Sequence, residues 1–392
     1  MKSIKEAELK NKKALMRCDF NVPIKNGKIS DSSRIKKSLP TIKYLLKEKS
    51  SVFIMTHLGR PEGRDKKFSV KPVAEQLKKI TKKRVYVIDN ILDKKIKKLE
   101  STEEGNIYLF ENIRFWEEEE ENNFNFAKEI AQNFDLYVND AFSVSHRAHA
   151  SVDAIARYLP HYAGLSLVEE IEELSKIKNT PHHPFVVIVG GAKVSDKIDV
   201  MLNLAKKADY VLAGGAVANT FLLKRGYKIG ASRFDEDSLG IVSEIEKKAH
   251  TRVMLPTDAV CAASLKAAKT QIVDIHSIPS AICSIPYSIY DIGPKTIIKW
   301  EDILRTAKTV FWSGPLGVFE YSKFAHGTKK IARAISKVTS EGQETIVGGG
   351  DTIVCLNQFK IKKFTHISTA GSAMLQFVGG KNLPGIEALE RK

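Results

Sequence analysis

The chain has 392 residues, 43% of them hydrophobic, so it exceeds what one hydrophobic core usually supports and we expect two compact domains. Its 62 Lys and Arg against 46 Asp and Glu give a formal net charge of +16, which favours anionic partners, nucleic acid among them. The four cysteines are widely spaced, which argues against a disulfide framework and a zinc site. No run is apolar enough for a signal peptide or a membrane span, so we expect a cytoplasmic protein.

Short apolar runs rich in β-forming residues alternate with longer amphipathic segments along the whole chain. This alternation predicts βαβ units, parallel sheets and an α/β fold class. In the first half, strands are predicted to begin near Ala14, Val52, Val85, Ile107 and Leu136. In the second half, they are predicted to begin near Phe185, Tyr210, Val253, Gln271, Thr309, Thr345 and His366.

A linking helix is predicted over residues 163–179, where the apolar positions have approximately helical spacing. The segment PHHP at 181–184 ends this helix, because a residue that precedes proline avoids the helical region. The two series of strands therefore belong to two domains on either side of the helix.

Arginine and histidine dominate the segments that follow the strands of the first half. In open α/β sheets, ligands bind outside the carboxyl ends of the strands. Several side chains could therefore converge on one small ligand with several negative charges, since guanidinium groups bind phosphate and carboxylate in a bidentate manner. These candidates are Asp19, Asn21, Arg34, His57, Arg60, Arg114, His146, Arg147 and His149. A single arginine is more often a surface ion-pair partner, but recurrence after successive strands favours the binding site.

Two other patterns in this half have weaker functional interpretations. His146 and His149 could bind a metal, but they lack the HExxH pattern and an obvious third ligand. The five glutamates from Glu117 to Glu121 are interpreted as a solvated turn and receive no role.

Glycine dominates the corresponding segments of the second half. They are GGAKVSDK (190–197), AGGAVANTF (213–221), SGPLGVFE (313–320), GGGDT (348–352) and STAGSA (368–373). A glycine loop that leads into a helix presents N–H groups and the positive end of the helix dipole to phosphate oxygens. One glycine pair alone would indicate only a tight turn, but five such loops predict a nucleotide site.

Two features extend this prediction from nucleotide binding to phosphoryl transfer. Lys193 and Lys197 are four residues apart at a predicted helix start, so both ammonium groups are expected on one helix face toward the phosphates. Asp351 follows three glycines, where an N-cap role is the structural expectation. A carboxylate among phosphates requires a divalent cation between them, and Mg²⁺ prefers one or two carboxylates plus phosphate oxygens. We therefore predict Mg²⁺ at Asp351.

Motifs of several other enzyme classes do not occur in the chain: GxxxxGK[ST], HRD with DFG, a complete GxGxxG and GxSxG. Two alternatives stay open at this point. A non-catalytic nucleic-acid binder would account for the net charge, and another ATP-dependent kinase or ligase of small acids would share the glycine loops.

The motifs RCDFNVP, DSSRI, THLGRP, ENIRF, SHRAHAS, GGAKVSDK, SGPLGVFE and GGGDT resemble, in this order, those of the phosphoglycerate kinase family. The match covers essentially the whole chain. It implies reversible phosphoryl transfer between ATP and the carboxyl group of 3-phosphoglycerate, giving ADP and 1,3-bisphosphoglycerate. It also implies a monomeric glycolytic enzyme with two Rossmann-like lobes, each a parallel sheet flanked by helices, joined by a hinge helix. GKNLPGIEALE resembles the return of the C-terminus to the first lobe, which gives domains of 1–162 plus 378–392 and of 163–377.

The resemblance also assigns residues to each substrate. The phosphoglycerate would be held by Asp19, Asn21, Arg34, His57, Arg60, Arg114 and Arg147. The nucleotide would be held by Gly190, Gly191, Lys193, Lys197, Gly215, Glu320, Gly348, Gly349, Gly350, Asp351 and Thr352. Glu320 suits the ribose hydroxyls, because a carboxylate can accept hydrogen bonds from both. Direct in-line transfer is expected with Arg34, Lys193 and Lys197 around the transferring group, after closure about segments 163–179 and 369–378.

Overall fold

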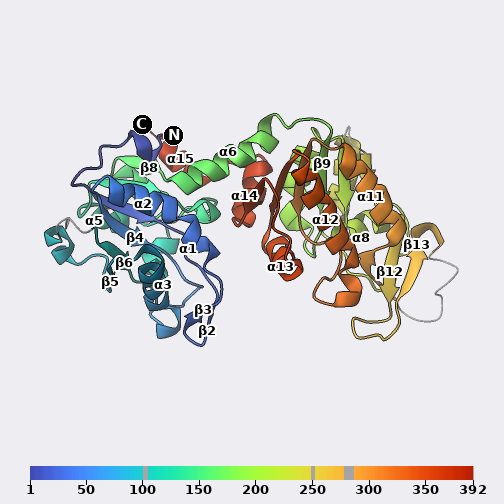
Figure 1. Ribbon diagram of the computed structural model, residues 1–392, viewed down its shortest axis with the longest axis horizontal. Helices are drawn as coiled ribbons and strands as arrows, with labels where there is room; N and C mark the ends of the chain where they lie inside the picture. Colours follow the sequence, from blue (N-terminus) through green and yellow to red (C-terminus); the bar gives the residue numbers. More distant parts are fainter. Residues whose placement is uncertain (100–104, 249–251, 278–286, 392) are drawn as a thin grey trace. The chain divides into compact units, whose positions relative to one another are not determined.

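A computed structural model describes residues 1–99, 105–248, 252–277 and 287–391. Contacts between residues divide the chain into two units (Figure 1). Unit 1 comprises Met1–Glu172 and Asn382–Lys392, and unit 2 comprises Glu173–Lys381. The linking helix α6 (Leu165–Asn179) begins in unit 1 and ends in unit 2, and the predicted helix over 163–179 is thereby confirmed.

Unit 1 is built on a six-stranded sheet in the order β5-β6-β4-β1-β7-β8, with every neighbouring pair parallel. Its strands are β1 (Lys13–Arg17), β4 (Ser51–Met55), β5 (Val85–Ile88), β6 (Ile107–Phe110), β7 (Leu136–Asn139) and β8 (His161–Ala163). A small hairpin consists of β2 (Ile24–Lys25) and β3 (Lys28–Ile29). All five strands predicted for the first half are confirmed, whereas β8 and the two hairpin strands β2 and β3 were not predicted.

Helices cover both faces of this sheet. They are α1 (Ser33–Lys37), α2 (Leu39–Lys47), α3 (Lys71–Thr81), α4 (Glu117–Glu120), α5 (Phe124–Ala131) and α15 (Pro384–Glu390). Short 3-10 helices are η1 (Ile4–Glu6), η2 (Lys66–Phe68), η3 (Lys94–Lys98), η4 (Ile113–Phe115), η5 (Phe142–Val144) and η6 (Ala154–Arg157). The C-terminal α15 belongs to unit 1, where the N–H of Gly385 donates to the carbonyl of Ser145 (2.8 Å).

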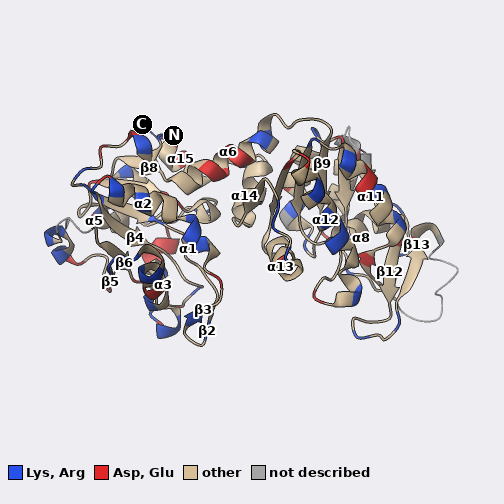
Figure 2. Ribbon diagram, viewed as in Figure 1, with Lys and Arg blue, Asp and Glu red and all other residues tan. Residues whose placement is uncertain are grey.

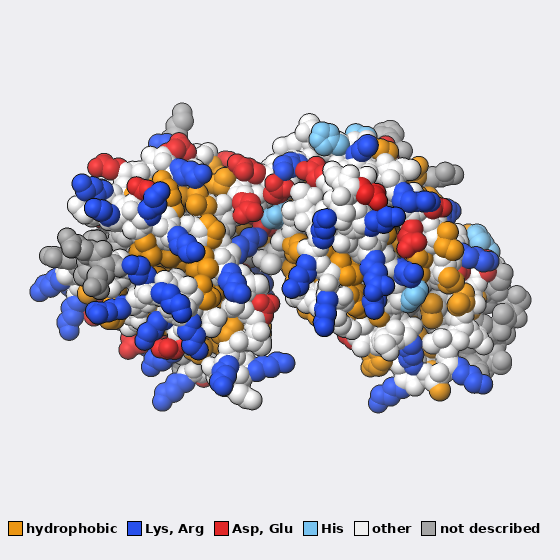
Figure 3. All heavy atoms as spheres, viewed as in Figure 1, with side chains coloured by type: hydrophobic (Ala, Val, Ile, Leu, Met, Phe, Trp, Pro, Cys, Tyr) orange, Lys and Arg blue, Asp and Glu red, His pale blue; other side chains and the backbone are white. Residues whose placement is uncertain are grey.

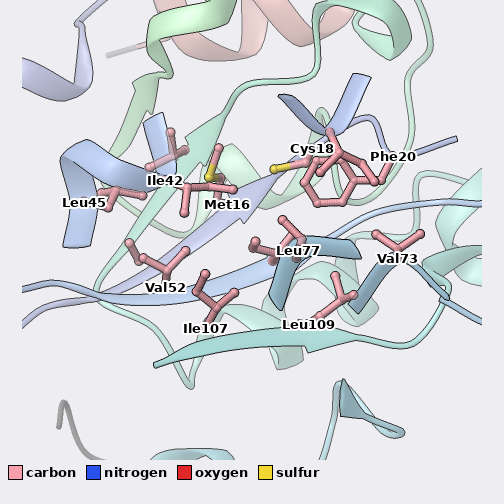
Figure 4. Packing of buried hydrophobic residues seen from close by; sticks show 14 of the residues in the cluster. Met16, Cys18, Phe20, Ile42, Leu45, Val52, Val73, Leu77, Ile107 and Leu109 are labelled. Carbon is pink, nitrogen blue, oxygen red and sulfur yellow. The ribbon is translucent and has the colours of Figure 1, made fainter. Parts of the chain in front are cut away.

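Alternation along the strands determines which face of the sheet each side chain covers. Met16, Val52 and Ile107 point to one face, where they meet Leu45 of α2 and Leu77 of α3 (Figure 4). Phe53 points to the opposite face and packs against other aromatic rings there. Each fully buried side chain of this size contributes about 1.5–3 kcal/mol to stability. The burial on both faces explains why these strands read as continuous apolar runs.

Unit 2 has a second six-stranded parallel sheet, in the order β11-β10-β9-β15-β16-β17. Its strands are β9 (Phe185–Val189), β10 (Tyr210–Ala213), β11 (Arg252–Met254), β15 (Thr309–Ser313), β16 (Glu344–Gly348) and β17 (His366–Ser368). The strand predicted near Gln271 exists as β13 (Gln271–Asp274), but it is not part of the parallel sheet. It pairs in an antiparallel sheet with β12 (Asp258–Ala262), which in turn pairs with β14 (Ser288–Ile292).

The helices of unit 2 pack around a core that includes the fully buried Trp300 and Trp312. They are α7 (Ile198–Leu204), α8 (Gly215–Lys224), α9 (Leu239–Lys248), α11 (Pro294–Thr306), α12 (His326–Ser340), α13 (Gly350–Phe359) and α14 (Ser372–Val378). The 3-10 helices are η7 (Ser195–Lys197), η8 (Ile275–Ser277) and η9 (Ser322–Phe324). Two parallel sheets flanked by helices confirm the predicted α/β fold with a Rossmann-like sheet in each part.

The basic residues are distributed over both units (Figure 2), and on the visible face in Figure 3 the Lys and Arg side chains are spread among polar and apolar atoms. Cys18, Cys261 and Cys355 are buried free thiols, and Cys283 lies outside the described residues. Within the described part of the chain, no helix combines the length and the apolar character needed to cross a membrane.

Candidate active site

The loop that follows β1 places Asp19 at the carboxyl end of the sheet of unit 1. Its Oδ2 lies 2.7 Å from Nη1 of Arg34, which α1 supplies, and also accepts a hydrogen bond from Ser143. Its Oδ1 accepts from the N–H of Asn21 (3.0 Å). Burial alone would raise the pKa of Asp19, but the positive charge of Arg34 and these hydrogen bonds lower it overall. Asp19 is therefore an anion that orients Arg34.

The loops after β4 and β6 are tied to the same region by hydrogen bonds. Oδ1 of Asn21 accepts from the N–H of Gly59 (2.9 Å), and Nη1 of Arg114 donates to the carbonyl of Gly59 (2.6 Å). His57, which follows β4, is buried. Burial is the largest cause that lowers its pKa well below the usual value, and the positive charges of Arg17, Arg114 and Arg34 add to this effect. The negative charge of Asp19 opposes this lowering of the pKa without reversing it. His57 is therefore neutral near pH 7.

The remaining candidates of unit 1 are less tightly held. Arg60 is exposed, and Arg147 is partly buried with its Nε 3.4 Å from Nε2 of His146. Burial and the neighbouring Arg147 lower the pKa of His146 to about 4. His149 is buried, and its Nδ1 lies 3.6 Å from Oε1 of Glu119. His146 and His149 belong to no group of three or more potential metal ligands within the described ranges.

The interpretation of residues 117–121 as a solvated turn is wrong for Glu119. This residue lies in α4, is completely buried and accepts hydrogen bonds from the N–H and the hydroxyl of Ser151 (2.8 and 2.6 Å). Glu120 lies 2.9 Å from Nε of Arg114. A run of five like charges gives no signal that one of them points inward, so the sequence could not separate Glu119 from its neighbours.

In unit 2 the glycine loops after β9 and β15 are packed against each other. The N–H groups of Gly190 and Gly191 donate to the carbonyls of Ser313 (2.9 Å) and Pro315 (2.7 Å). These two N–H groups are therefore not available to a ligand, contrary to the expectation for the loop. A Cβ on Gly190 would lie 2.2 Å from the carbonyl oxygen of Pro315, so this position tolerates no side chain.

A cavity of about 400 Å³ lies over these loops. Four of the residues predicted for the nucleotide line it: Gly191, Gly215, Glu320 and Asp351. Its other walls are largely apolar, formed by side chains such as Leu222 and Leu316. An apolar cavity with a few polar groups at its edge is typical of a site for a small organic ligand.

The predicted lysine geometry is wrong. The helix expected to carry both residues, α7, begins only at Ile198, so Lys193 precedes it and Lys197 is its N-cap. The two residues are nevertheless adjacent, because Nζ of Lys197 donates to the carbonyl of Lys193 (3.2 Å).

The N-cap role expected for Asp351 is not observed. Gly349 occupies that position in α13 without a side-chain cap, at φ 104°, and Asp351 lies exposed in the first turn. Gly348 ends β16 and Gly350 is the first residue of the helix. Thr352 is completely buried, and its Oγ1 accepts from the N–H of Gly314 (2.8 Å).

Comparison with known proteins agrees with this arrangement. The family model described as phosphoglycerate kinase matches residues 4–381. The chain belongs to the phosphoglycerate kinase family.

Individual phosphoglycerate kinases support the assignment. That of Thermosipho africanus is 43% identical over 398 residues, covering 100% of this chain and 98% of that protein. That of Dictyoglomus turgidum is 44% identical over 395 residues, covering 99% and 98%. The solved structure from Coxiella burnetii has a TM-score of 0.88 at 39% identity and covers 99% of this chain and 98% of its own.

A phosphoglycerate kinase transfers a phosphoryl group reversibly between ATP and 3-phosphoglycerate, giving ADP and 1,3-bisphosphoglycerate. This chain is accordingly a glycolytic kinase with ATP or ADP as one substrate and the phosphoglycerate as the other.

The cavity of unit 2 also involves residues that the sequence did not reveal. Asp291 in β14 is buried and lines the cavity. Burial raises its pKa to about 7, although it accepts hydrogen bonds from the N–H groups of Gly327 (2.7 Å) and Ile292 (2.9 Å). Thr328 of α12 accepts from the N–H of Leu316 (3.0 Å) and supports the loop after β15. These residues belong to elements that lie outside the glycine motifs, and β14 itself was not predicted.

Proposed function

We propose that the residues gathered in unit 1 hold 3-phosphoglycerate. The set comprises Asp19, Asn21, Arg34, His57, Arg60, Arg114 and Arg147. Support comes from the ion pair between Asp19 and Arg34 and from the bonds that join Asn21 and Arg114 to Gly59. Guanidinium groups match the phosphate and the carboxylate of this substrate in charge and shape. His57, being neutral, contributes an N–H donor without adding charge.

The nucleotide is proposed to occupy the cavity of unit 2. Apolar side chains around Leu316 suit the base, and Glu320 suits the ribose hydroxyls. Gly349 is the N-cap of α13 and Gly350, Asp351 and Thr352 are its first residues, and the first N–H groups of a helix have no partner within that helix. These groups would bind phosphate oxygens together with Lys193 and Lys197. Gly190, Gly191, Gly215 and Gly348 would act by permitting close approach of the backbone.

Mg²⁺ is proposed as the accompanying metal, held by Asp351. Asp351 is exposed at the cavity and belongs to no group of three potential metal ligands in the described residues, so phosphate oxygens would complete the coordination. This donor set fits Mg²⁺, which is commonly bound by one or two carboxylates plus phosphates. When bound, the ion would neutralise charge on the phosphates.

Phosphoryl transfer is proposed to be direct, with Arg34, Lys193 and Lys197 stabilising the charge of the transferring group. One unit charge at about 4 Å contributes on the order of 4 kcal/mol at an effective dielectric constant of 20, before desolvation is subtracted. The reaction requires the two bound substrates to meet, so closure about segments 163–179 and 369–378 is part of the proposal. We further propose that the protein acts as a monomer in the cytoplasm and binds neither a specific nucleic acid nor a membrane.

The test is a coupled assay with ATP, Mg²⁺ and 3-phosphoglycerate, combined with separate binding measurements for each substrate. We expect ATP consumption only when 3-phosphoglycerate is present. The residue assignment predicts that substitutions in the unit 1 set weaken phosphoglycerate binding and leave ADP binding unchanged. Steeply salt-dependent binding of DNA or RNA at physiological salt would instead support a nucleic-acid partner.

A further inference from the structure

Arg17 lies directly behind the proposed phosphoglycerate site. It is the last residue of β1 and its side chain is completely buried. Its Nε donates to Oγ of Ser151 (2.8 Å), its Nη1 donates to the carbonyl of Cys18, and its Nη2 lies 3.3 Å from Nδ1 of His57. All three nitrogens of the guanidinium are therefore engaged inside unit 1, and none is directed to solvent.

The charge of Arg17 is balanced by Glu119, the buried glutamate that interrupts the acidic run. Nη2 of Arg17 lies 3.9 Å from Oε1 of Glu119, and both side chains are fully buried. Ser151 joins them, because its hydroxyl accepts from Arg17 and donates to Glu119 (2.6 Å). A buried pair held by additional hydrogen bonds is rigid, and removal of one partner leaves an uncompensated charge.

The contact with Arg17 determines which ring nitrogen of His57 carries the proton. A guanidinium has only donors, so it is compatible with Nδ1 only if Nδ1 presents a lone pair. The proton of a neutral imidazole must then be on Nε2. Among the residues that the structure describes, no hydrogen-bond partner of Nε2 is present, so this N–H can donate to a ligand.

We propose that Arg17, held by Glu119 and Ser151, is a positioning residue that fixes His57 as the neutral Nε2–H tautomer, aimed at an anionic oxygen of the phosphoglycerate. The inference rests on the proposed role of His57. The charged groups around the ring agree with it: Arg17 from β1, Arg34 from α1 and Arg114 from η4 oppose protonation, and Asp19 alone favours it.

The test is the ¹⁵N and ¹H chemical shifts of the ring of His57 in ligand-free enzyme, assigned by comparison with His57→Gln. In the wild type we expect a protonated Nε2 and an unprotonated Nδ1 from pH 6 to 8. A proton on Nδ1 in the wild type overturns the inference, and this measurement requires no variant that could misfold.

Variants test the role of Arg17 itself. The double variant Arg17→Met/Glu119→Gln removes both buried charges together, and it should show a mixture of tautomers and a KM for 3-phosphoglycerate raised about tenfold, the equivalent of one hydrogen bond of about 1.4 kcal/mol. The KM for ATP should not change. Arg17→Lys, which keeps a donor, should retain the tautomer. An unchanged tautomer in the double variant overturns the inference whatever happens to KM.

A separate variant tests the role on which the inference rests. His57→Ala should itself raise the KM for 3-phosphoglycerate. If it does not, the proposed binding role of His57 fails, and the tautomer measurement still decides whether Arg17 controls the ring.

Discussion

Nη1 of Arg34 lies 2.7 Å from Oδ2 of Asp19, so the arginine proposed to act in catalysis is paired within unit 1. Arg34→Ala should lower kcat by about 100-fold or more, since loss of one transition-state contact costs roughly 2.7–4 kcal/mol. The Kd for ADP, measured by calorimetry, should stay within twofold, because Arg34 belongs to unit 1 and the cavity proposed for the nucleotide belongs to unit 2. The kcat of Arg34→Lys should lie between those of the wild type and of Arg34→Ala. A loss of ADP affinity in Arg34→Ala as large as its loss of kcat would contradict the assignment.

Asp351 offers a test of the proposed metal. Asp351→Asn keeps the size and removes the charge, so the Mg²⁺ concentration that gives half-maximal activity should rise by about tenfold, equivalent to about 1.4 kcal/mol. Binding of 3-phosphoglycerate should be unaffected. Glu341→Gln, an exposed carboxylate at the end of α12, is the matched control and should leave the Mg²⁺ dependence unchanged. Equal Mg²⁺ dependence in Asp351→Asn and wild type would remove Asp351 from the metal site.

Asp140 makes stability depend on pH. Burial raises its pKa to about 7, even though Thr41 (2.8 Å) and the N–H of Ser166 at the start of α6 (3.0 Å) donate to its Oδ1. The folded state therefore binds a proton that the unfolded state releases near pH 4, and this contribution to stability is complete below about pH 4 and is lost as pH rises through 7.

Asp140→Asn has no such titration. The free energy of unfolding of the variant, relative to wild type, should accordingly increase between pH 5 and pH 8, by an amount on the order of a few kcal/mol. Urea unfolding at each pH measures this difference. Glu8→Gln, at an exposed position, should give a constant difference across the same range. A difference for Asp140→Asn that does not change with pH would show that the carboxyl group is ionised throughout.

Gly190 should tolerate no side chain, because its Cβ would lie 2.2 Å from one backbone oxygen, that of Pro315, and 2.8 Å from another, that of Gly314. Gly190→Ala should separate the loops beneath the cavity proposed for the nucleotide and weaken ADP binding by tenfold or more, about 1.4 kcal/mol. Gly240→Ala is the control, since nothing lies within 4 Å of its Cβ and the position is inside α9. It should be neutral or stabilise the protein by up to about 1 kcal/mol. Unchanged ADP affinity in Gly190→Ala would show that the loops can move apart without cost.

The sequence by itself determined the fold class and most of its strands. The buried strand β9 is uniformly apolar and β4 is apolar after Ser51, because helices cover both faces of the sheets, and this pattern can be recognised locally in the sequence. The basic character of one set of strand ends and the glycine content of the other are equally local. The strand β14 was not predicted, since it is an element of a small antiparallel sheet and its burial alternates irregularly.

Only the tertiary structure decided what individual charged residues do. Glu119 is chemically identical to Glu118 and Glu120, and it differs from them only because helix α4 turns it toward Arg17 and Ser151. Likewise, the N–H of Gly191 is occupied by Pro315, a residue more than 120 positions away. Burial and long-range hydrogen bonds depend on which segments the fold brings together, and no local pattern in the sequence encodes them.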